Sequence, residues 1–415
     1  MSYQFALARY NEDGGLDTSF DYDGKVLTEF VSSSGAQANA LAIDGRGKIV
    51  VGGWARIDRG GQFALARFNE DGSLDNSFHF NGKLLTDFTS SSSEGVSAVA
   101  IDDHGKIVVG GRAAYYSDTG QEIVALAKYN VDGSLDRDFG AEGKVLTNFR
   151  WMRERGGACG MAIDYRGRII TLGTGVERTS DHLVLVSHNP DGSQHNNYII
   201  TFTRLSSLYT TSLAIDGQGR ILVGGWTELE GRSEGNHFYV ARFLNPDEGM
   251  MMDDSFNRRY GMGGYIVTDF LSASRERINA IAVDGRGRVV VGGWAQVSGR
   301  HQFALARYSD DGTLDTTFHY DGKVLTDFRS SSREQITAIA LDGRGRIVVG
   351  GWAQVSDGSQ FALARYLDDG SLDTSFHYDG KVLTNFYSAS IEQINAIAID
   401  DRGRIVVAGF ALVDD

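Results

Sequence analysis

Proline and cysteine are almost absent from this sequence. Of its 415 residues, two are proline and one is cysteine, Cys159, whereas average usage would give about ten times as many prolines. A single cysteine excludes an internal disulfide. The sequence also has no run of about 20 apolar residues, the length that spans a bilayer as a helix. Because its first residues resemble no signal peptide, we expect a cytoplasmic location.

An excess of basic residues is lacking as well. The sequence has 54 acidic and 40 basic residues, which gives a formal net charge of -14 at pH 7. This balance argues against a general affinity for nucleic acid. The apolar fraction of 41% and the charged fraction of 23% are ordinary for a globular protein, so extended disorder is excluded. Glycine is abundant by contrast, with 53 residues and no triplet period, and this excess requires a structural cause.

The cause is an internal repeat with a period of about 58 residues. A segment that reads Phe-Ala-Leu-Ala-Arg-Tyr at residues 5–10 returns, with variations, six more times along the chain. The approximate repeats are residues 5–62, 63–122, 123–182, 183–237, 238–302, 303–360 and 361–415. Length alone would predict about three domains, but a regular repeat takes precedence over that expectation. We therefore expect one domain, residues 1–415.

Each repeat divides into four short strands, which we name A to D. The clearest examples are strand A at 336–341, B at 346–352, C at 303–308 and D at 323–328. They alternate in polarity and are bounded by glycine turns, such as the hairpin at 342–345 between A and B. Units of this kind indicate an all-β fold, a seven-bladed β-propeller with four antiparallel strands per blade. We expect residues 3–30 to close the ring as strands C and D beside A and B at 392–413.

The repeat resembles that of the bacterial delta-60 repeat proteins. The shared motifs are Leu-Asp-x-x-Phe at 372–376, Gly-Lys-Val at 380–382, the apolar run from Asp400 to Val407, and Phe-Ala-Leu-Ala-Arg-Tyr at 361–366. The resemblance covers essentially the whole chain and implies a propeller, but it brings no common activity and no site residue. Where the family usually has glycine after the phenylalanine of the first motif, this sequence has Asp21, His79, His319 or His377.

The basic residue of strand C varies together with the aspartate of the Leu-Asp motif. The pairs are Arg9 with Asp17, Arg67 with Asp75, Lys128 with Asp136, Arg242 with Asp253, Arg307 with Asp315 and Arg365 with Asp373. In the fourth repeat both charges are lost, and the positions hold Ser187 and His195. We interpret these pairs as structural, because a partly buried aspartate without its cation is costly.

Acidic glycine turns, such as residues 21–24, bear a superficial likeness to calcium loops. Their spacing matches no known loop, and histidine replaces Asp21 in three repeats. We therefore predict no metal and no cofactor.

Two sets of positions are candidates for binding a ligand. One follows the glycines of strand B and holds Trp54, Arg112, Thr174, Trp226, Trp294, Trp352 and Phe410. Its indoles are either packing wedges between blades or faces for sugar rings and cations. The other, at the start of strand A, holds Asn39, Ser97, Cys159, Thr211, Asn279, Thr337 and Asn395, with Glu94, Glu276, Glu334 and Glu392 nearby. These side chains are either a solvated rim or the lining of a central pocket.

Symmetry is broken most in repeats three to five. His182 and His237 stand there in place of a glutamine that other repeats have at 62, 302 and 360. Together with Glu154, Cys159 and Arg112, these histidines are the candidate catalytic set if the protein is an enzyme, since one active site requires asymmetry. No nucleophile motif or metal-ligand spacing accompanies them.

The leading hypothesis is a non-catalytic propeller that binds carbohydrate, or another small molecule, through the loops of one face. Near-identical repeats would offer several equivalent sites, and multivalent binding would use them. The alternatives are a lyase, cyclase or hydrolase with an axial pocket near repeats three to five, and a protein-docking scaffold. We expect no nucleic-acid partner and no membrane span, and the sequence leaves the oligomeric state open.

Overall fold

A computed structural model describes most of the chain. The described residues are 2–30, 35–58, 60–88, 93–114, 122–147, 160–177, 180–202, 205–229, 236–244, 250–257, 263–270, 275–328, 333–355, 358–386 and 391–413. Every helix or strand among them is a β-strand. In this part of the chain no helix is long and apolar enough to cross a membrane.

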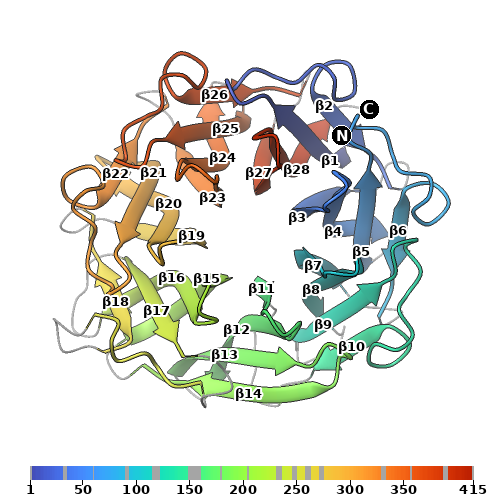
Figure 1. Cartoon of the computed structure of the whole chain (residues 1–415), viewed down its shortest axis with the longest axis horizontal. Coiled ribbons are helices and arrows are strands. Elements are labelled where there is room, and N and C mark those ends of the chain that lie inside the picture. The colour runs from blue at the N-terminus through green and yellow to red at the C-terminus, as the bar shows by residue number, and fades with distance from the viewer. Residues whose placement is uncertain are drawn as a thin grey trace. The chain divides into compact units, whose positions relative to one another are not determined.

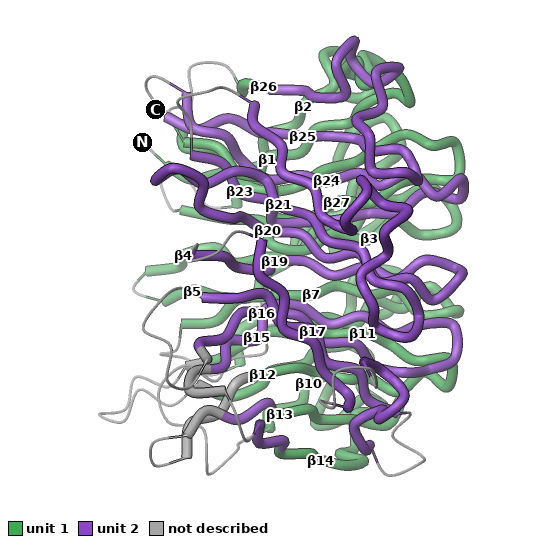
Figure 2. Tube along the Cα trace, turned by 90° about the vertical axis from the view of Figure 1, so that its left-hand side faces the viewer, with its two compact units in different colours: residues 1–179, 184–199, 385–415 green, residues 180–183, 200–384 purple. Residues whose placement is uncertain are grey.

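The chain divides into two compact units (Figure 2). Unit 1 consists of residues 1–179, 184–199 and 385–415, and unit 2 of residues 180–183 and 200–384. Each unit is built from antiparallel groups of four strands, in which the second and third strands pair with neighbours on both sides. The sheets thus share one repeated design.

Unit 1 contains the sheet that joins both ends of the chain (Figure 1). Its strands are β27 (Ile391–Ile399), β28 (Ile405–Val413), β1 (Ser2–Tyr10) and β2 (Lys25–Thr28). β1 runs antiparallel to β28, with Ser2 opposite Val413 and Tyr10 opposite Ile405. The N-terminal C and D strands therefore pair with the C-terminal A and B strands, so neither β1 nor β28 is a free edge.

The other strands of unit 1 follow the same order. They are β3 (Ala36–Ile43), β4 (Ile49–Ile57), β5 (Gly60–Phe68), β6 (Lys83–Thr86), β7 (Ser93–Ile101), β8 (Ile107–Ala114), β9 (Glu122–Tyr129), β10 (Lys144–Thr147), β11 (Gly160–Ile163), β12 (Ile169–Glu177), β13 (Ser180–His188) and β14 (Gln194–Ile200). The first residues of β13 and the last of β14 belong to unit 2.

Unit 2 repeats the pattern. Its strands are β15 (Leu205–Ile215), β16 (Ile221–Leu229), β17 (His237–Phe243), β18 (Tyr265–Thr268), β19 (Glu276–Val283), β20 (Val289–Val297), β21 (Arg300–Tyr308), β22 (Lys323–Thr326), β23 (Glu334–Leu341), β24 (Ile347–Val355), β25 (Gly358–Tyr366) and β26 (Lys381–Thr384). Hydrophobic clusters lie between consecutive sheets; one, for example, joins Leu222 and Val240 to Ile278 and Val291.

The first strand of most sheets carries a bulge, and this bulge explains the paired glycines of strand B. In β19 the register with β20 shifts between Ile278 and Ala280, which leaves Asn279 as the extra residue. Opposite the bulge, a Cβ atom added to Gly293 would lie 1.7 Å from the carbonyl oxygen of Arg277. No side chain fits there, so the second glycine of the pair is required by the close approach of two backbones.

In at least four repeats, a buried arginine on the third strand binds a backbone carbonyl of the following repeat. Arg307 donates from Nε to Asp315 Oδ2 at 2.8 Å, from Nη2 to Thr317 Oγ1 at 3.2 Å, and from Nη1 to the carbonyl oxygen of Asp368 at 2.5 Å. Its guanidinium also lies 4.7 Å from the ring centre of Phe318. Asp368 belongs to the following repeat, so one side chain fixes both its own C to D link and its neighbour.

The predicted structural pair is present in five repeats. The Arg Nε to Asp Oδ2 distances are 2.8 Å for Arg9–Asp17, 2.9 Å for Arg67–Asp75, and 2.8 Å for Arg242–Asp253, Arg307–Asp315 and Arg365–Asp373. Burial acts to raise the pKa of Asp75, but the hydroxyl and backbone N–H of Ser77, with Lys48 and the charge of Arg67, outweigh it and hold the pKa at about 2. These aspartates are therefore ionised in the folded protein.

Two repeats differ from this arrangement. The predicted pair Lys128–Asp136 is wrong, because Lys128 pairs with Asp102 at 3.0 Å and Lys106 takes Asp136 at 2.8 Å. A lysine lacks the planar fork of arginine, so it does not hold an aspartate and the neighbouring backbone together. In the fourth repeat a hydrogen-bond contact of 3.3 Å between Ser187 Oγ and His195 Nδ1 replaces the ion pair.

This substitution in the fourth repeat provides a control for a stability test. We expect Arg307→Ser alone, or Asp315→His alone, to lower the free energy of unfolding by about 3–5 kcal/mol, because each leaves one buried partner of an ion pair uncompensated. The double variant recreates the pair Ser187–His195 and should lose clearly less than the sum of the two single losses. Urea unfolding followed by circular dichroism measures all three. Strict additivity would contradict the pairing.

Candidate functional site

The small polar residues at the bulges bind backbone rather than facing solvent alone. Asn39 Nδ2 donates to the carbonyl oxygen of Val96 at 2.8 Å, and Asn279 Nδ2 donates to that of Ile336 at 2.7 Å. Asn395 Nδ2 reaches Ala38 at 2.8 Å, and Thr211 Oγ1 reaches Ile278 at 2.8 Å. Each acceptor belongs to the bulge region of the next repeat. These four residues therefore stabilise the contact between neighbouring repeats.

The buried glutamates near these bulges also have a repeated backbone contact. Glu94, Glu276, Glu334 and Glu392 accept from the backbone N–H of the phenylalanine six residues earlier, at 3.0, 2.6, 2.8 and 2.6 Å. They tie the start of one sheet to the end of the strand before it. The carboxylate at this position is therefore a recurring structural feature of the repeat, and the residue opposite it varies between repeats.

The tryptophans lie among other side chains, and in unit 2 they form a stacked row. Tyr209 stacks on Trp226, with ring centres 3.9 Å apart, and Trp294 stacks on His301 at 3.8 Å. The guanidinium of Arg277 lies 4.5 Å from the Trp226 ring centre and 5.7 Å from that of Trp294. We name these five residues the stacked row. Trp294 is buried and Trp226 half-buried, so packing accounts for much of their surface.

The remaining indole positions are in comparable surroundings. Trp54 and Trp352 are half-buried, and Arg112, which holds this position in unit 1, is exposed. A Cβ added to Gly95, on the first strand of the next sheet, would lie 3.4 Å from Trp54 Cβ. These contacts run between neighbouring repeats, which agrees with the wedge interpretation, while the half-exposed rings still present some area to a ligand.

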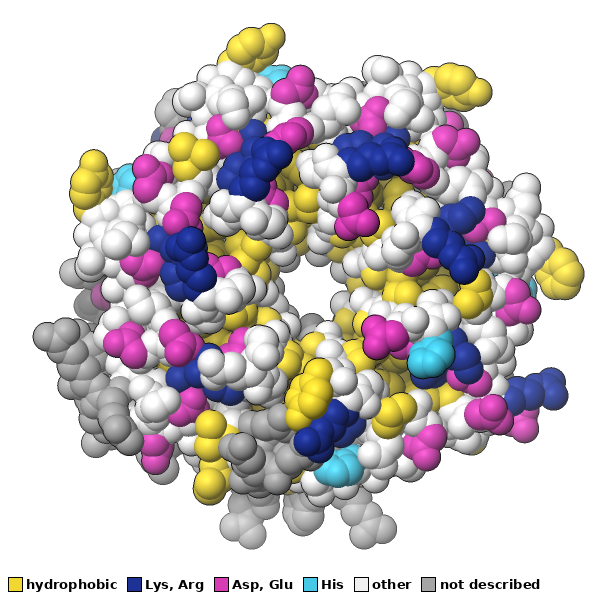
Figure 3. Space-filling model, viewed as in Figure 1, with side chains coloured by type: hydrophobic (Ala, Val, Ile, Leu, Met, Phe, Trp, Pro, Cys, Tyr) yellow, Lys and Arg dark blue, Asp and Glu magenta, His cyan; other side chains and the backbone are white. Residues whose placement is uncertain are grey.

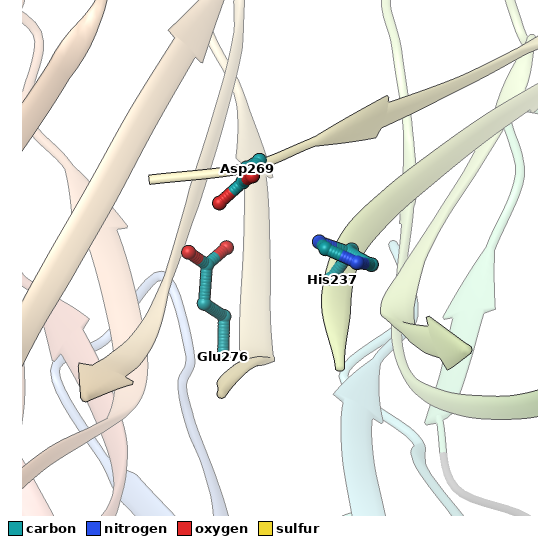
Figure 4. Close-up of side chains that lie close together, drawn as sticks. All are labelled: His237, Asp269 and Glu276. Carbon is teal, nitrogen blue, oxygen red and sulfur yellow. The ribbon is translucent and has the colours of Figure 1, made fainter. Parts of the chain in front are cut away.

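Three ionisable side chains of unit 2 converge at one place (Figure 4). His237 begins β17, Asp269 follows β18, and Glu276 begins β19. One ligand atom from each lies within 4.8 Å of those from the other two. His237 and Glu276 are buried and Asp269 is exposed. We name this group the His-Asp-Glu cluster.

Sequence analysis identified part of this region. It singled out His237, Trp226 and Trp294, and the structure places them near one another through the pairing of Trp226 with Phe238 and the contacts of Arg277. It missed Asp269, Arg277 and the two outer rings of the stacked row. The signal for Asp269 was present, because an acidic residue follows the D strand at 29, 87, 269 and 327.

Among the described residues, His237 is the only proposed catalytic residue in the His-Asp-Glu cluster. His182 Nδ1 lies 2.8 Å from Thr201 Oγ1, a separate contact at the corresponding place of the fourth repeat. Arg112 belongs to unit 1, whereas His182 and His237 belong to unit 2. Glu154 and Cys159 lie outside the described residues.

A different kind of candidate occurs four times in the C to D links. Tyr22, Phe80, Tyr320 and Tyr378 are 92–93% exposed. Both these residues and the ones before them have positive φ, between 45° and 67°. We name the pairs 21–22, 79–80, 319–320 and 377–378 the left-handed corners. In the space-filling view, isolated hydrophobic side chains project from a polar surface (Figure 3). The exposure of these rings was not predicted from the sequence, in which only the preceding residue departs from the family pattern.

The corners are held by backbone contacts. The amide of His79 donates to the carbonyl oxygen of Asp132 at 2.9 Å, and that of His319 donates to Asp369 at 2.8 Å. Each acceptor lies in the next repeat. Left-handed backbone is uncommon for bulky residues and costs about 1–3 kcal/mol per residue. The surrounding repeat therefore maintains a conformation that glycine would adopt without strain.

A pocket of about 310 Å³ lies between two A to B hairpins of unit 1, and charged side chains line it. Arg404 pairs with Asp400 at 2.6 Å and with Glu70 at 2.7 Å, and Arg402 also pairs with Glu70. Because these charges are paired with one another, they do not favour the binding of a charged ligand in this pocket.

A stability test can distinguish a structural role of the bulge side chains from simple exposure to solvent. We expect Asn279→Ala to lower the free energy of unfolding by about 1–3 kcal/mol, because the carbonyl of Ile336 loses its donor. Asn279→Thr is the matched control, since Thr211 makes the equivalent contact, and it should lose less. Thermal and urea unfolding measure both variants. A loss below about 0.5 kcal/mol for the alanine variant is typical of a solvated surface position and would contradict the scaffold role.

The comparisons with known proteins agree with the fold. Residues 2–20, 47–78, 105–139, 287–318 and 345–376 match the sequence model of a family described as "Domain of unknown function (DUF5122) beta-propeller". Curated protein sequences give no match. These five segments, about a third of the chain, support a β-propeller repeat family.

Several solved structures are similar over nearly the whole chain. The polysaccharide lyase Uly1 has a TM-score of 0.53 at 10% identity and covers 98% of this chain and 99% of its own. A protein of unknown function from Dyadobacter fermentans DSM 18053 has a TM-score of 0.44 at 9% identity, with coverages of 99% and 98%. Sqt1 of Chaetomium thermophilum has a TM-score of 0.48 at 11% identity, with coverages of 92% and 95%. At such identities the likeness to Uly1 shows a shared fold alone: the chain has a β-propeller fold.

Proposed function

We propose that this chain is a closed seven-bladed propeller of the delta-60 repeat kind, and that it binds carbohydrate without catalysing a reaction. The observation that carries the proposal is the set of four left-handed corners. Each presents an aromatic ring almost wholly to solvent, at the same place in four near-identical repeats. Repeated equivalent rings supply weak contacts that add up on a polymeric ligand.

The ring exposure is difficult to explain by folding. A ring that is 92–93% exposed contributes almost no buried area and therefore almost no hydrophobic stabilisation. Its backbone is strained as well. A residue that costs stability and gains none from packing is more consistent with binding than with scaffolding. An aromatic face offers an apolar surface on which the C–H face of a sugar ring can pack.

Polar groups flank each ring and supply the second element that sugar recognition needs. His79, His319 and His377 precede three of the rings, and Asp21 precedes the fourth. The residue after each ring is acidic or an amide, at 23, 81, 321 and 379. Hydroxyl groups of a sugar can donate to carboxylates and accept from amides, so each corner combines an apolar face with polar neighbours.

We therefore propose the corners as the main binding site, in place of the B to C loops that the sequence suggested. The indoles of Trp54, Trp226 and Trp352 are half-buried and that of Trp294 is buried, whereas the corner rings are 92–93% exposed. Three corner rings meet the ring of the preceding histidine edge-on. In an antiparallel four-stranded sheet, C to D links lie at the strand ends opposite the B to C loops. The indole positions remain a second contact surface in the proposal.

An enzymatic function is the second candidate, and the His-Asp-Glu cluster favours it. Within the part of the chain that the structure describes, the cluster occurs once, as an active site requires, and it combines a buried histidine with two carboxylates. Such a set can exchange protons with a substrate, as lyases and hydrolases do. Cleavage of the glycan during the binding experiment would show that the protein is an enzyme and not a non-catalytic carbohydrate-binding protein.

Replacing the corner tyrosines tests the proposal directly. Asparagine tolerates left-handed backbone, so Tyr378→Asn should keep or slightly raise the melting temperature while it removes one binding site. We expect a glycan array to identify a ligand, and calorimetry to give about four sites per chain, with one fewer in Tyr378→Asn. The variant with all four rings replaced should not bind.

The matched control is Tyr165→Asn, which removes a ring that is 69% exposed and lies in an A to B turn rather than a corner. This control should bind as the unmodified chain does. Absence of binding on the array contradicts the proposal. Binding that survives loss of all four corner rings but is lost in Trp352→Ala would assign the ligand to the indole positions instead.

A further inference from the structure

We propose that the His-Asp-Glu cluster binds a divalent transition-metal ion of the Zn²⁺ type. The proposed ligands are one imidazole nitrogen of His237 and one carboxylate oxygen each from Asp269 and Glu276. The proposal is independent of carbohydrate binding, because the cluster and the left-handed corners share no residue. It concerns a single place in unit 2 and not the repeated acidic turns.

The fold brings the three side chains together from two consecutive sheets. His237 begins β17 and Asp269 follows β18, which pair with each other in one sheet, whereas Glu276 begins β19 in the next. Glu276 is held in place because its Oε1 accepts from the backbone N–H of Phe270 at 2.6 Å. One ligand is thereby fixed by the repeat design, and the imidazole faces it across the sheet boundary (Figure 4).

The histidine itself indicates a missing partner. His237 is 3% exposed, and neither Nδ1 nor Nε2 has a hydrogen-bond partner among the described residues. A buried polar group without a partner costs about 1–3 kcal/mol. Neutral imidazole is the commonest side-chain ligand of metal ions, and a bound ion would satisfy one of these nitrogens.

The charges around the cluster favour a cation. Asp269 forms no ion pair with a described lysine or arginine; Lys323 contacts only its backbone carbonyl oxygen, at 3.1 Å. Two carboxyl groups and an imidazole therefore meet within 4.8 Å, where two negative charges would repel each other. A divalent ion would neutralise both carboxylates at once.

The donor set also selects the class of ion. One nitrogen and two oxygens suit Zn²⁺, Mn²⁺ or Co²⁺, whereas Ca²⁺ takes six to eight oxygens. With metal to ligand distances near 2.1 Å, tetrahedral ligands lie about 3.4 Å apart. The ligand atoms lie within 4.8 Å of one another, so the separations would have to shorten by up to about 1.4 Å, and the side chain of Asp269 is exposed. Three protein ligands leave a position for water.

The repeats contain natural controls for this site. Equivalent trios are Gln62, Asp87 and Glu94, and Gln302, Asp327 and Glu334, where a carboxamide takes the place of the imidazole. Two carboxylates and a carboxamide are much poorer ligands for Zn²⁺. His237→Gln therefore restores the residue that other repeats have, and it should fold. Gln302→His introduces the proposed ligand set in a second repeat.

The experiment is titration of the untagged, chelator-treated full chain with Zn²⁺ by calorimetry, and with Co²⁺ by visible absorption. We expect one site per chain with a dissociation constant in the micromolar range or below. His237→Gln should weaken Zn²⁺ binding at least 100-fold and leave the unfolding midpoint in chelator unchanged or higher. Gln302→His should raise the stoichiometry to two. Ca²⁺ should not compete.

Three results would overturn the proposal. The first is no binding of Zn²⁺ or Co²⁺ to the folded chain. The second is unchanged affinity in His237→Gln, which would assign the ion to other side chains. The third is a stoichiometry that stays at one in Gln302→His, because the proposal derives the ligand geometry from the shared frame. None of these results depends on whether the chain binds carbohydrate.

Discussion

The buried arginine of the third strand is the interaction on which the rest of the structure depends. Its guanidinium binds the aspartate of its own C to D link, the ring of the phenylalanine in that link, and a backbone carbonyl of the following repeat. A sheet of four short strands cannot bury both of its faces alone. The arginine contact therefore sets the distance and orientation between two consecutive repeats. The same contact recurs along the chain within each unit.

The same contact fixes the links that carry the left-handed corners. The Leu-Asp-x-x-Phe segment is clamped at its aspartate and its phenylalanine, so the two residues that follow are directed outward. Strain in the corners is tolerated because the clamp and the amide contacts to the next repeat determine the backbone there. We thus assign function to residues that the packing of the repeats does not require. The corners depart in ring exposure. His237 departs because it replaces a glutamine beside Glu276, one of four glutamates that accept a hydrogen bond from a backbone N–H.

Much of the frame could be predicted from the sequence, because it rests on local chemistry that recurs. The period, the four strands and the Arg–Asp pairs follow from motif spacing. The joint loss of both charges at Ser187 and His195 is visible in the sequence, but the contact between these two residues was not predicted. The exchange of partners around Lys128 could not be predicted, since it depends on the reach of lysines in neighbouring strands. The exposed rings were missed because an aromatic residue between two turn glycines usually packs against the protein. Here the positive φ of the corner residues directs the ring outward. Asp269 was missed because its proximity to Glu276 requires knowing how two sheets meet.

Hydrogen exchange at the left-handed corners tests this account most directly. The amides of Asp21, His79 and His319 belong to exposed turn residues, yet each donates to a carbonyl of the next repeat, at 2.8, 2.9 and 2.8 Å. If the arginine clamp holds these links, their amides should exchange as slowly as those of buried strands such as β24. Exchange at the rate of an unstructured peptide would contradict the central claim that the repeat frame holds the corners in place.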